Sequence, residues 1–151
     1  RGATSATGVG AATKVATRGG TAKVLVVDDD PDWRGLVSVA LRDEGYRLFS
    51  APDGPEALAL ARSENPDLIL LYWEMVEMDG LTVCRALRAV KDPHLRAVPI
   101  VMLTARAGSE DTKQGFEAGA NDYLTKPFTP AHLRTRVREW LARELRGRST
   151  F

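Results

Sequence analysis

Several residue types and segments are scarce in this chain of 151 residues, and each scarcity excludes a class of protein. Cys84 is the single cysteine, so no internal disulfide can form, and a reduced, cytoplasmic protein is expected. The two histidines lie far apart in the sequence, and no paired Cys and His spacing typical of a zinc site occurs. The longest uninterrupted apolar run covers residues 68–73, far short of the roughly 20 residues that a membrane helix needs. We therefore expect no membrane span.

The charge is nearly balanced overall, but it is segregated along the chain. There are 21 Lys and Arg against 20 Asp and Glu, a net charge of +1. Residues 1–23 carry four basic side chains and no acid, residues 24–130 carry 11 basic and 18 acidic side chains, and residues 131–151 carry six Arg and two Glu. An acidic body argues against a protein that binds nucleic acid through bulk charge, so no direct nucleic-acid contact is expected.

The composition divides the chain into three parts. Of the first 23 residues, 17 are Ala, Thr, Gly or Ser, and no hydrophobic periodicity is visible there. Such a composition is typical of a flexible tether. We therefore predict a flexible basic linker over residues 1–22, one folded domain over residues 23–147, and a short tail over residues 148–151.

Within the predicted domain, short apolar runs alternate with amphipathic segments. The predicted strands are 24–27, 46–50, 68–72, 100–103 and 123–125, and the predicted helices are 31–44, 55–64, 81–90, a weaker segment around 114–118, and 133–145. Asp30 and Thr129 are placed to cap the first and last helices, and Gly45, Gly119 and Gly147 stand where helices are expected to end. Five strands alternating with five helices predict an open parallel α/β sheet with helices on both faces.

Polar side chains gather where these predicted strands end, the edge at which ligands bind in such sheets. They are Asp28, Asp29 and Asp30 after the first strand, Tyr72 at the end of the third, Thr104 at the end of the fourth, and Lys126 after the fifth; the small residue Ala105 follows Thr104, and Pro127 follows Lys126. Carboxylates, a hydroxyl and a lysine suit a hard cation and a phosphoryl group. However, the third strand ends without a carboxylate that could act as a nucleophile.

Four sequence blocks carry a resemblance to a known family. They are VLVVDDDP (24–31), PDLILLYWEMVEMDGLTVCRALR (66–88), PIVMLTA (99–105) and GANDYLTKPF (119–128). In this order and spacing they resemble the receiver domain of bacterial two-component response regulators, over about residues 23–146. The resemblance implies a flavodoxin-like (βα)5 fold with a five-stranded parallel sheet of order 2-1-3-4-5.

The resemblance also implies roles for the residues at the strand ends. In the family, an Asp at the end of the third strand accepts a phosphoryl group from a histidine kinase, and the acidic pair, here Asp28 and Asp29, helps to bind the Mg²⁺ needed for transfer. Thr104 matches the hydroxyl that binds the phosphoryl group, and Ala105 matches the small residue that keeps the pocket open. Tyr123 matches the aromatic residue whose rotamer follows the hydroxyl, and Lys126 matches the lysine that pairs with the phosphoryl group.

One departure from the family pattern bears directly on mechanism. Tyr72 stands at the phosphoacceptor position, and Val76 replaces the usual proline of the following loop. A phenol with a pKa near 10 is only about 0.1% ionised at neutral pH, whereas an Asp is fully ionised. Tyr72 also supplies no carboxylate to a metal, so Mg²⁺ binding should be weakened.

The sequence leaves the roles of these residues open. Tyr72 either fills the phosphoryl space with its hydroxyl near Lys126, Thr104 or an acid of the first strand, or packs there without a polar partner. Asp28 and Asp29 either keep a metal site or form an ion pair with Lys126. Two further alternatives concern side chains near the same edge: Thr104 and Tyr123 are a working switch or packing residues, and Glu74 and Asp79 are substitute ligands or solvated loop acids.

We therefore expect an atypical receiver domain, a non-enzymatic signalling module whose state is not set by aspartyl phosphorylation. Its expected partners are a histidine kinase or an output protein, and a homodimer through the face of the fourth helix, fifth strand and fifth helix. The alternative is a phosphoryl-accepting regulator in which Tyr72 replaces a native Asp or another acid accepts. A small α/β enzyme is disfavoured, because no Gly-rich phosphate loop follows the first strand.

Overall fold

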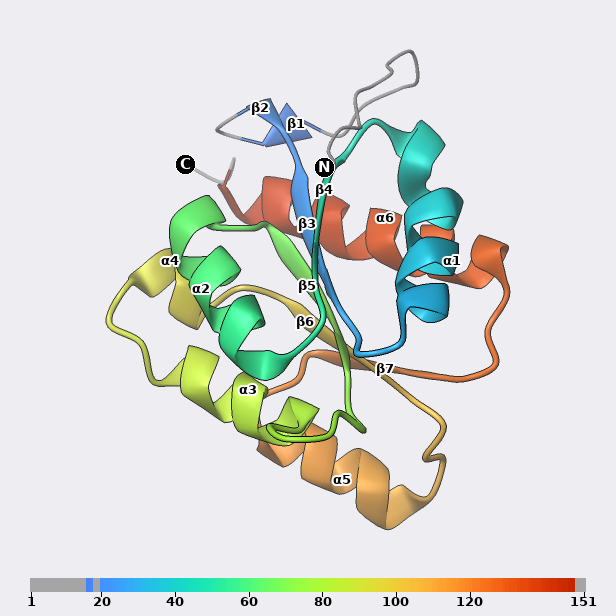
Figure 1. Ribbon diagram of the computed structural model, residues 1–151. Coiled ribbons are helices and arrows are strands. Elements are labelled where there is room, and N and C mark those ends of the chain that lie inside the picture. Colours follow the sequence, from blue (N-terminus) through green and yellow to red (C-terminus); the bar gives the residue numbers. More distant parts are fainter. Residues whose placement is uncertain (1–15, 18–19, 149–151) are drawn as a thin grey trace.

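Five parallel strands form the centre of the structure, a computed structural model that describes residues 16–17 and 20–148 (Figure 1). The strands are β3 (Lys23–Val27), β4 (Arg47–Ala51), β5 (Leu68–Tyr72), β6 (Ile100–Thr104) and β7 (Asp122–Thr125). Their order across the sheet is β4-β3-β5-β6-β7, which is 2-1-3-4-5 when these five are counted along the chain. This order confirms the sequence prediction, and each strand boundary lies within one residue of the predicted one.

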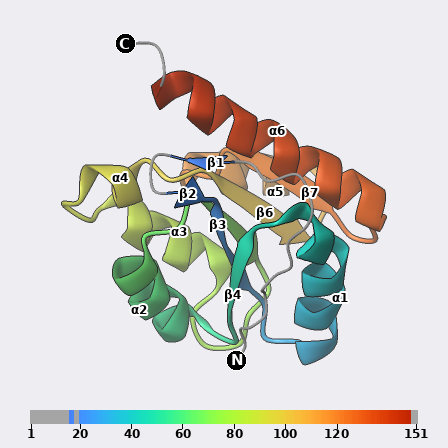
Figure 2. The same cartoon turned by 90° about the horizontal axis from the view of Figure 1, so that it is seen from above.

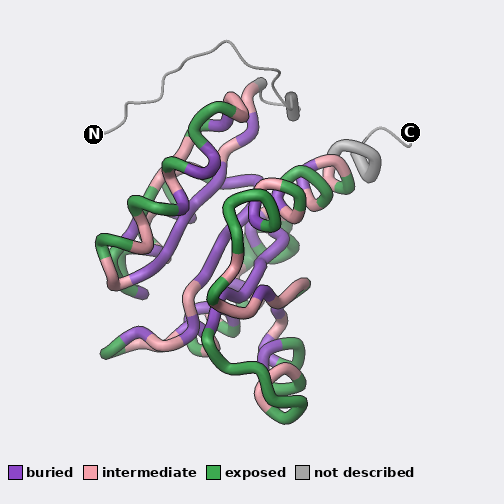
Figure 3. Tube along the Cα trace, turned by 90° about the vertical axis from the view of Figure 1, so that its right-hand side faces the viewer, coloured by how far each residue is buried: buried purple, intermediate pink, exposed green. Residues whose placement is uncertain are grey.

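The three central strands are apolar throughout, because side chains on both of their faces are covered. In β3, β5 and β6 nearly every side chain is buried, and the parallel register places Val24 beside Leu68 and Ile69 beside Ile100. Continuous apolar runs of this kind are typical of parallel strands between two helical layers. Figure 3 shows the buried positions following the strands, while exposed positions lie on the outer turns of the helices.

Helices cover both faces of the sheet. The helices are α1 (Pro31–Leu41), α2 (Gly54–Glu64), α3 (Gly80–Arg88), α4 (Pro93–Arg96), α5 (Ser109–Glu117) and α6 (Pro130–Arg148). One core packs α1 and α6 against the sheet, and the other packs α2 and α3 against its opposite face (Figure 2). Among the described helices, none combines the length and the apolar character that crossing a membrane requires.

The helix ends match the sequence prediction in part. Asp30 caps α1 by accepting a hydrogen bond from the Asp32 amide, and Thr129 accepts one from the His132 amide at the start of α6. The prediction that the last helix ends at Gly147 is wrong, since α6 runs to Arg148. A glycine in a helix costs only about 1 kcal/mol, so one more helical residue is tolerated. The short α4 was not predicted. The start of α5 was also missed, because the first turns of this helix carry few of the apolar residues on which the prediction relied.

A short antiparallel pair lies in the segment that the composition assigned to a linker. Strand β1 (Ala16–Thr17) pairs with β2 (Gly20–Thr21), so the expectation of no regular structure is wrong for these four residues. Ala22, the last residue of the predicted linker, is buried. Residues 1–15 and 18–19 of that linker and residues 149–151 of the predicted tail lie outside the described part of the chain. The domain boundaries therefore stay predictions.

Tyr46, next to β4, carries a buried hydroxyl for which the described residues offer no hydrogen-bond partner. Burial, with the nearby charge of Glu44, raises the pKa of Tyr46 to about 12.

We expect Tyr46→Phe to increase the free energy of unfolding by about 1 kcal/mol, because it removes an unsatisfied buried polar group. Urea unfolding measures this change. Tyr123→Phe is the control, since the Tyr123 hydroxyl donates a hydrogen bond and its removal should not stabilise the protein. A loss of stability in Tyr46→Phe would show that its hydroxyl has a partner.

Candidate functional site

The polar residues singled out in the sequence do meet at one edge of the sheet. Asp28 directly follows β3, Tyr72 is the last residue of β5, Thr104 is the last residue of β6, and Lys126 directly follows β7. All four strands run in the same direction, so their carboxyl ends meet at the lower edge of the sheet in Figure 1. Side-chain contacts divide these residues into two clusters.

The first cluster is built on a buried ion pair between Asp28 and Lys126. The Lys126 Nζ atom lies 3.2 Å from Asp28 Oδ2, and the two side chains are 8% and 3% exposed. The other carboxylate oxygen, Oδ1, accepts a hydrogen bond of 3.0 Å from the Asp30 amide. Burial raises the pKa of Asp28, although the Asp30 amide and the Lys126 ammonium oppose the rise. Each oxygen of this carboxylate therefore has a donor within the chain.

Two aromatic rings complete the surroundings of the Lys126 ammonium. The Nζ atom lies 3.6 Å from the centre of the Tyr72 ring and 4.0 Å from the centre of the Trp33 ring. Contacts this short between a cation and a ring face are attractive. One alternative from the sequence expected the Tyr72 hydroxyl to lie near Lys126. In the structure, the face of the Tyr72 ring contacts Lys126.

The phenol of Tyr72 is held in its neutral form. Burial raises the pKa of Tyr72, and the negative charges of Glu74, Asp28 and Asp29 raise it further. Because a nucleophilic phenol must lose its proton, this environment makes Tyr72 a poorer nucleophile than a free tyrosine.

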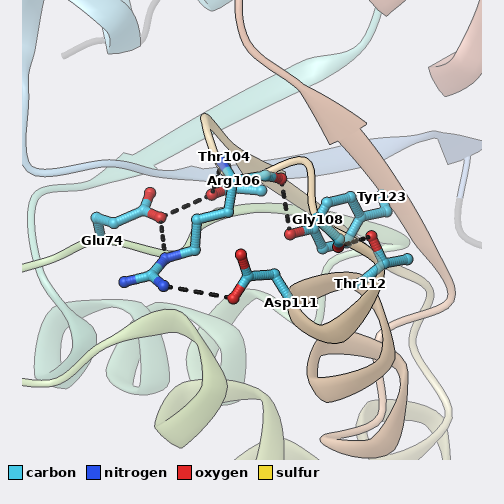
Figure 4. Close-up of polar contacts among 7 residues, drawn as sticks. All are labelled: Glu74, Thr104, Arg106, Gly108, Asp111, Thr112 and Tyr123. Atoms are coloured by element: carbon cyan, nitrogen blue, oxygen red, sulfur yellow. Dashed lines mark hydrogen bonds and ion pairs between the residues drawn. The ribbon is translucent and has the colours of Figure 1, made fainter.

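The second cluster centres on the hydroxyl of Thr104, which is completely buried (Figure 4). It donates a hydrogen bond of 2.7 Å to Glu74 Oε2 and accepts one of 3.0 Å from the Arg106 amide. The Arg106 Nε atom donates to the same Glu74 oxygen. The Arg106 guanidinium also lies over the ring of Trp73, 4.8 Å from its centre. Glu74 therefore joins the end of β6 to the loop that follows it.

Tyr123, in β7, is connected to this second cluster through the backbone of Arg106. The Tyr123 hydroxyl donates a hydrogen bond of 3.0 Å to the Arg106 carbonyl oxygen. Its ring meets the Trp73 ring edge-on, with 6.2 Å between the ring centres. Burial raises the pKa of Tyr123, with the charges of Asp111 and Glu74 adding to the effect. Thr104 and Tyr123 thus contact the same residue, Arg106.

Three other predicted residues lie outside these contacts. Asp29 is half-buried in the loop after β3, and Ala105 is exposed after β6. Asp79 caps α3 by accepting a hydrogen bond of 2.9 Å from the Thr82 amide, so it serves a helix end.

Sequence reasoning underrated Glu74 and missed Trp33, Trp73 and Arg106. The interpretation of Glu74 as a solvated loop acid is wrong in this structure, because the sheet pairing extends one residue beyond β5. The Trp73 amide donates to the Leu103 carbonyl, so Glu74 leaves the sheet on the same side as Tyr72. One sequence signal could have revealed this contact: Glu74, an acid, stands two residues after Tyr72, and Arg106, a base, stands two residues after Thr104.

The arrangement does not fit a divalent cation. Among the described residues, no group of three or more His, Cys, Asp or Glu side chains is placed to hold a metal. Both oxygens of Asp28 already accept hydrogen bonds, and one of them faces the Lys126 ammonium. A hard cation such as Mg²⁺ needs several free oxygen ligands, and Asp28 does not offer them.

Comparison with known proteins gives a consistent result. The sequence model of the response regulator receiver domain matches residues 24–138. The chain is 45% identical over 121 residues to the DNA-binding response regulator MtrA of Mycolicibacterium smegmatis, covering 80% of this chain and 51% of that protein. It is 44% identical to the DNA-binding dual master transcriptional regulator RpaA of Synechocystis, covering 80% of this chain and 49% of that protein. The chain thus spans about half the length of these curated relatives.

Solved structures show the same fold. The chemotaxis protein CheY4 of Vibrio cholerae superposes with a TM-score of 0.73 at 37% identity, covering 78% of this chain and 97% of that one. A Francisella response regulator receiver domain gives a TM-score of 0.74 at 33% identity, covering 82% and 98%. The sheet order and these neighbours establish a flavodoxin-like receiver fold.

Proposed function

This chain belongs to the response regulator receiver domain family, and from that premise we propose that it works as a protein-interaction module without aspartyl phosphorylation. One observation carries the proposal. The two donors that the resemblance assigns to the phosphoryl group, Lys126 and Thr104, are each bonded to a carboxylate of the chain itself, Asp28 and Glu74. A phosphoryl group would have to compete with both.

The side chain that ends β5 supports the same conclusion. We propose that Tyr72 occupies the phosphoacceptor position, because it ends the central strand between Asp28 and Thr104 and lies against Lys126. Its raised pKa keeps it protonated at neutral pH. A neutral phenol is a weak nucleophile for a phosphoryl donor, so Tyr72 is not proposed as a substitute acceptor.

The alternative function is a phosphoryl-accepting regulator, either with Tyr72 in place of a native Asp or with another acid as the acceptor. It is favoured by the position of Asp28, Thr104 and Lys126 at adjacent strand ends, which is the arrangement that the family uses. The two acids that the sequence offered as substitutes argue against a different acceptor, because both are already engaged: Glu74 binds Thr104, and Asp79 caps α3.

The proposed partners are proteins. The candidates are a histidine kinase, an output protein, and a second copy of the chain. The second copy would bind through the face formed by α5, β7 and α6. The matched relatives are named as DNA-binding regulators, but the chain covers only about half of each. For these 151 residues we propose no direct contact with nucleic acid, because residues 24–130 carry seven more acidic than basic side chains. A cytoplasmic location is proposed because the free thiol of Cys84 fits a reducing compartment. We also propose a non-enzymatic role, in keeping with a protein-interaction module.

Treatment with a small phosphoryl donor tests the proposal. The unaltered chain is incubated with acetyl phosphate and Mg²⁺, and its intact mass is measured. We expect no gain, because no free carboxylate stands at the end of β5 and the phenol is protonated. The addition of one acid-stable, base-labile phosphoryl group would establish the alternative function.

A further inference from the structure

The hydrogen bond between Thr104 and Glu74 leaves the threonine with no further proton to donate. A hydroxyl carries one donor, and that of Thr104 is directed at Glu74 Oε2 at 2.7 Å. The Thr104 side chain is completely buried, and the Glu74 side chain is 28% exposed. No phosphoryl group can receive a hydrogen bond from Thr104 unless Glu74 first gives up its own.

A carboxylate offers Thr104 the same kind of partner as a phosphoryl group. Both present anionic oxygens, and a charged acceptor makes a hydrogen bond shorter and stronger than a neutral one. Arg106 donates to the same oxygen and so compensates its charge. The pair formed by Glu74 and Thr104 therefore has the polarity of a phosphoryl group bound to a receiver hydroxyl.

The position of Glu74 is fixed by its neighbours in the chain. The Trp73 amide is bonded to the Leu103 carbonyl, and the Trp73 carbonyl accepts from the amides of Met75 and Gly80. Trp73 is buried, and its ring supports the guanidinium of Arg106. Glu74 is thus carried by an anchored backbone directly beside the end of β6.

The contacts continue from Glu74 to the surface of the domain. The Thr104 hydroxyl accepts from the Arg106 amide, and the Arg106 carbonyl accepts from the Tyr123 hydroxyl, both at 3.0 Å (Figure 4). The Arg106 side chain also reaches Asp111 in α5, at 3.5 Å. Whatever fixes the Thr104 hydroxyl therefore also fixes the loop before α5 and the orientation of Tyr123.

We propose that Glu74 is an internal ligand of Thr104, a carboxylate that takes the place of a transferred phosphoryl group and holds Thr104, Arg106 and Tyr123 in one conformation. This inference rests on the proposed function, because a chain regulated by phosphorylation would have to release Glu74 whenever it was modified. The signalling face of the domain is then set by a residue of the chain, without a kinase.

Amide hydrogen exchange followed by NMR tests this inference in the whole chain without any phosphoryl donor. Glu74→Ala removes the acceptor, and we expect the Arg106 amide to exchange up to about tenfold faster, because its bond to a fixed Thr104 hydroxyl is loosened. The ring signals of Tyr123 should shift in the same variant. Glu74→Gln keeps the shape and one neutral acceptor, so its effect should be intermediate.

Two matched controls separate this effect from a general loss of charge. Glu77→Ala removes an exposed acid of the same loop and should leave the Arg106 amide unchanged. Asp111→Asn removes the other acid beside Arg106 but leaves Thr104 bonded, so it too should leave the exchange rate near that of the unaltered chain. Unchanged exchange and unchanged Tyr123 signals in both Glu74 variants would overturn the proposal, and so would an equal effect of Glu77→Ala.

Two further outcomes are decided by the same design. If Glu74→Ala does not fold, Glu74→Gln decides: Thr104→Val should shift the Tyr123 signals in the same direction and further, and adding Glu74→Gln to Thr104→Val should change them no more. Additive shifts would contradict a shared contact. The proposed function is tested by a different measurement, because it fails if the chain gains mass with acetyl phosphate. The two proposals can therefore fail independently.

Discussion

Tyr72→Asp should turn a chain that gains nothing from acetyl phosphate into one that gains one phosphoryl group per molecule. The substitution places a carboxylate at the end of β5, between Asp28 and Thr104 and next to Lys126. An ionised carboxylate oxygen can attack the phosphorus atom, and acetate leaves with the electrons of the broken bond. It also removes the ring that lies against Lys126. Intact mass before and after treatment measures the gain.

The controls for this prediction isolate the nucleophile. Tyr72→Asn has nearly the same shape as the aspartate variant but no charged oxygen, so it should gain no phosphoryl group. Glu74→Gln added to Tyr72→Asp should speed the gain, because Thr104 then has a weaker internal acceptor. A failure of Tyr72→Asp to gain any mass would show that Tyr72 is not the residue that blocks phosphorylation.

The sheet could be predicted from the sequence because burial on both faces leaves an unmistakable pattern. The strand predicted over residues 68–72 lies in the longest apolar run of the chain, and the observed strand has the predicted bounds, Leu68–Tyr72. The start of α5 was predicted poorly for the opposite reason. Its first residues are polar, and Gly108 before it provides no side-chain cap, so neither periodicity nor a capping residue marks the start.

The candidate site could be predicted only as far as the strand ends determine it. Topology alone brings Asp28, Tyr72 and Lys126 to one edge. The partner of Thr104 could not be derived, because it depends on the backbone after β5, where pairing of Trp73 with Leu103 turns Glu74 inward. The choice between a metal site and an ion pair at Asp28 likewise depended on the direction of the Lys126 side chain, which spacing does not encode.

The side-chain contacts also change how the acidic pair is understood. Asp28 is buried and paired, whereas Asp29 is half-buried in the loop beside it. Adjacent carboxylates with such different surroundings do not act as equal ligands. Of the two acids, Asp28 is the one that forms the buried contact with Lys126, and the contribution of this contact to stability can be tested without reference to phosphorylation.

Lys126→Met should lower the free energy of unfolding by about 3–5 kcal/mol at neutral pH, because it leaves a buried carboxylate without its counter-ion. Methionine is unbranched and only one atom shorter than lysine, so it fills most of the same space, but it removes the ammonium that contacts the rings of Trp33 and Tyr72. Urea unfolding at a series of pH values measures the loss. Lys113→Met, which removes an exposed lysine of α5, is the matched control and should change stability little.

The pH dependence of this loss has a definite sign. Burial already raises the pKa of Asp28 in the folded chain, and removal of Lys126 takes away one of the influences that lower it. An acid whose folded pKa lies above its unfolded value binds more protons in the folded state, so stability falls as pH rises between the two values. The loss in Lys126→Met should therefore be small near pH 4, the ordinary pKa of an aspartate, and reach its full size above the raised pKa. Asp28→Asn combined with Lys126→Met should recover most of the lost stability at neutral pH, and a double variant as unstable as Lys126→Met alone would show that the buried charge is not the cause.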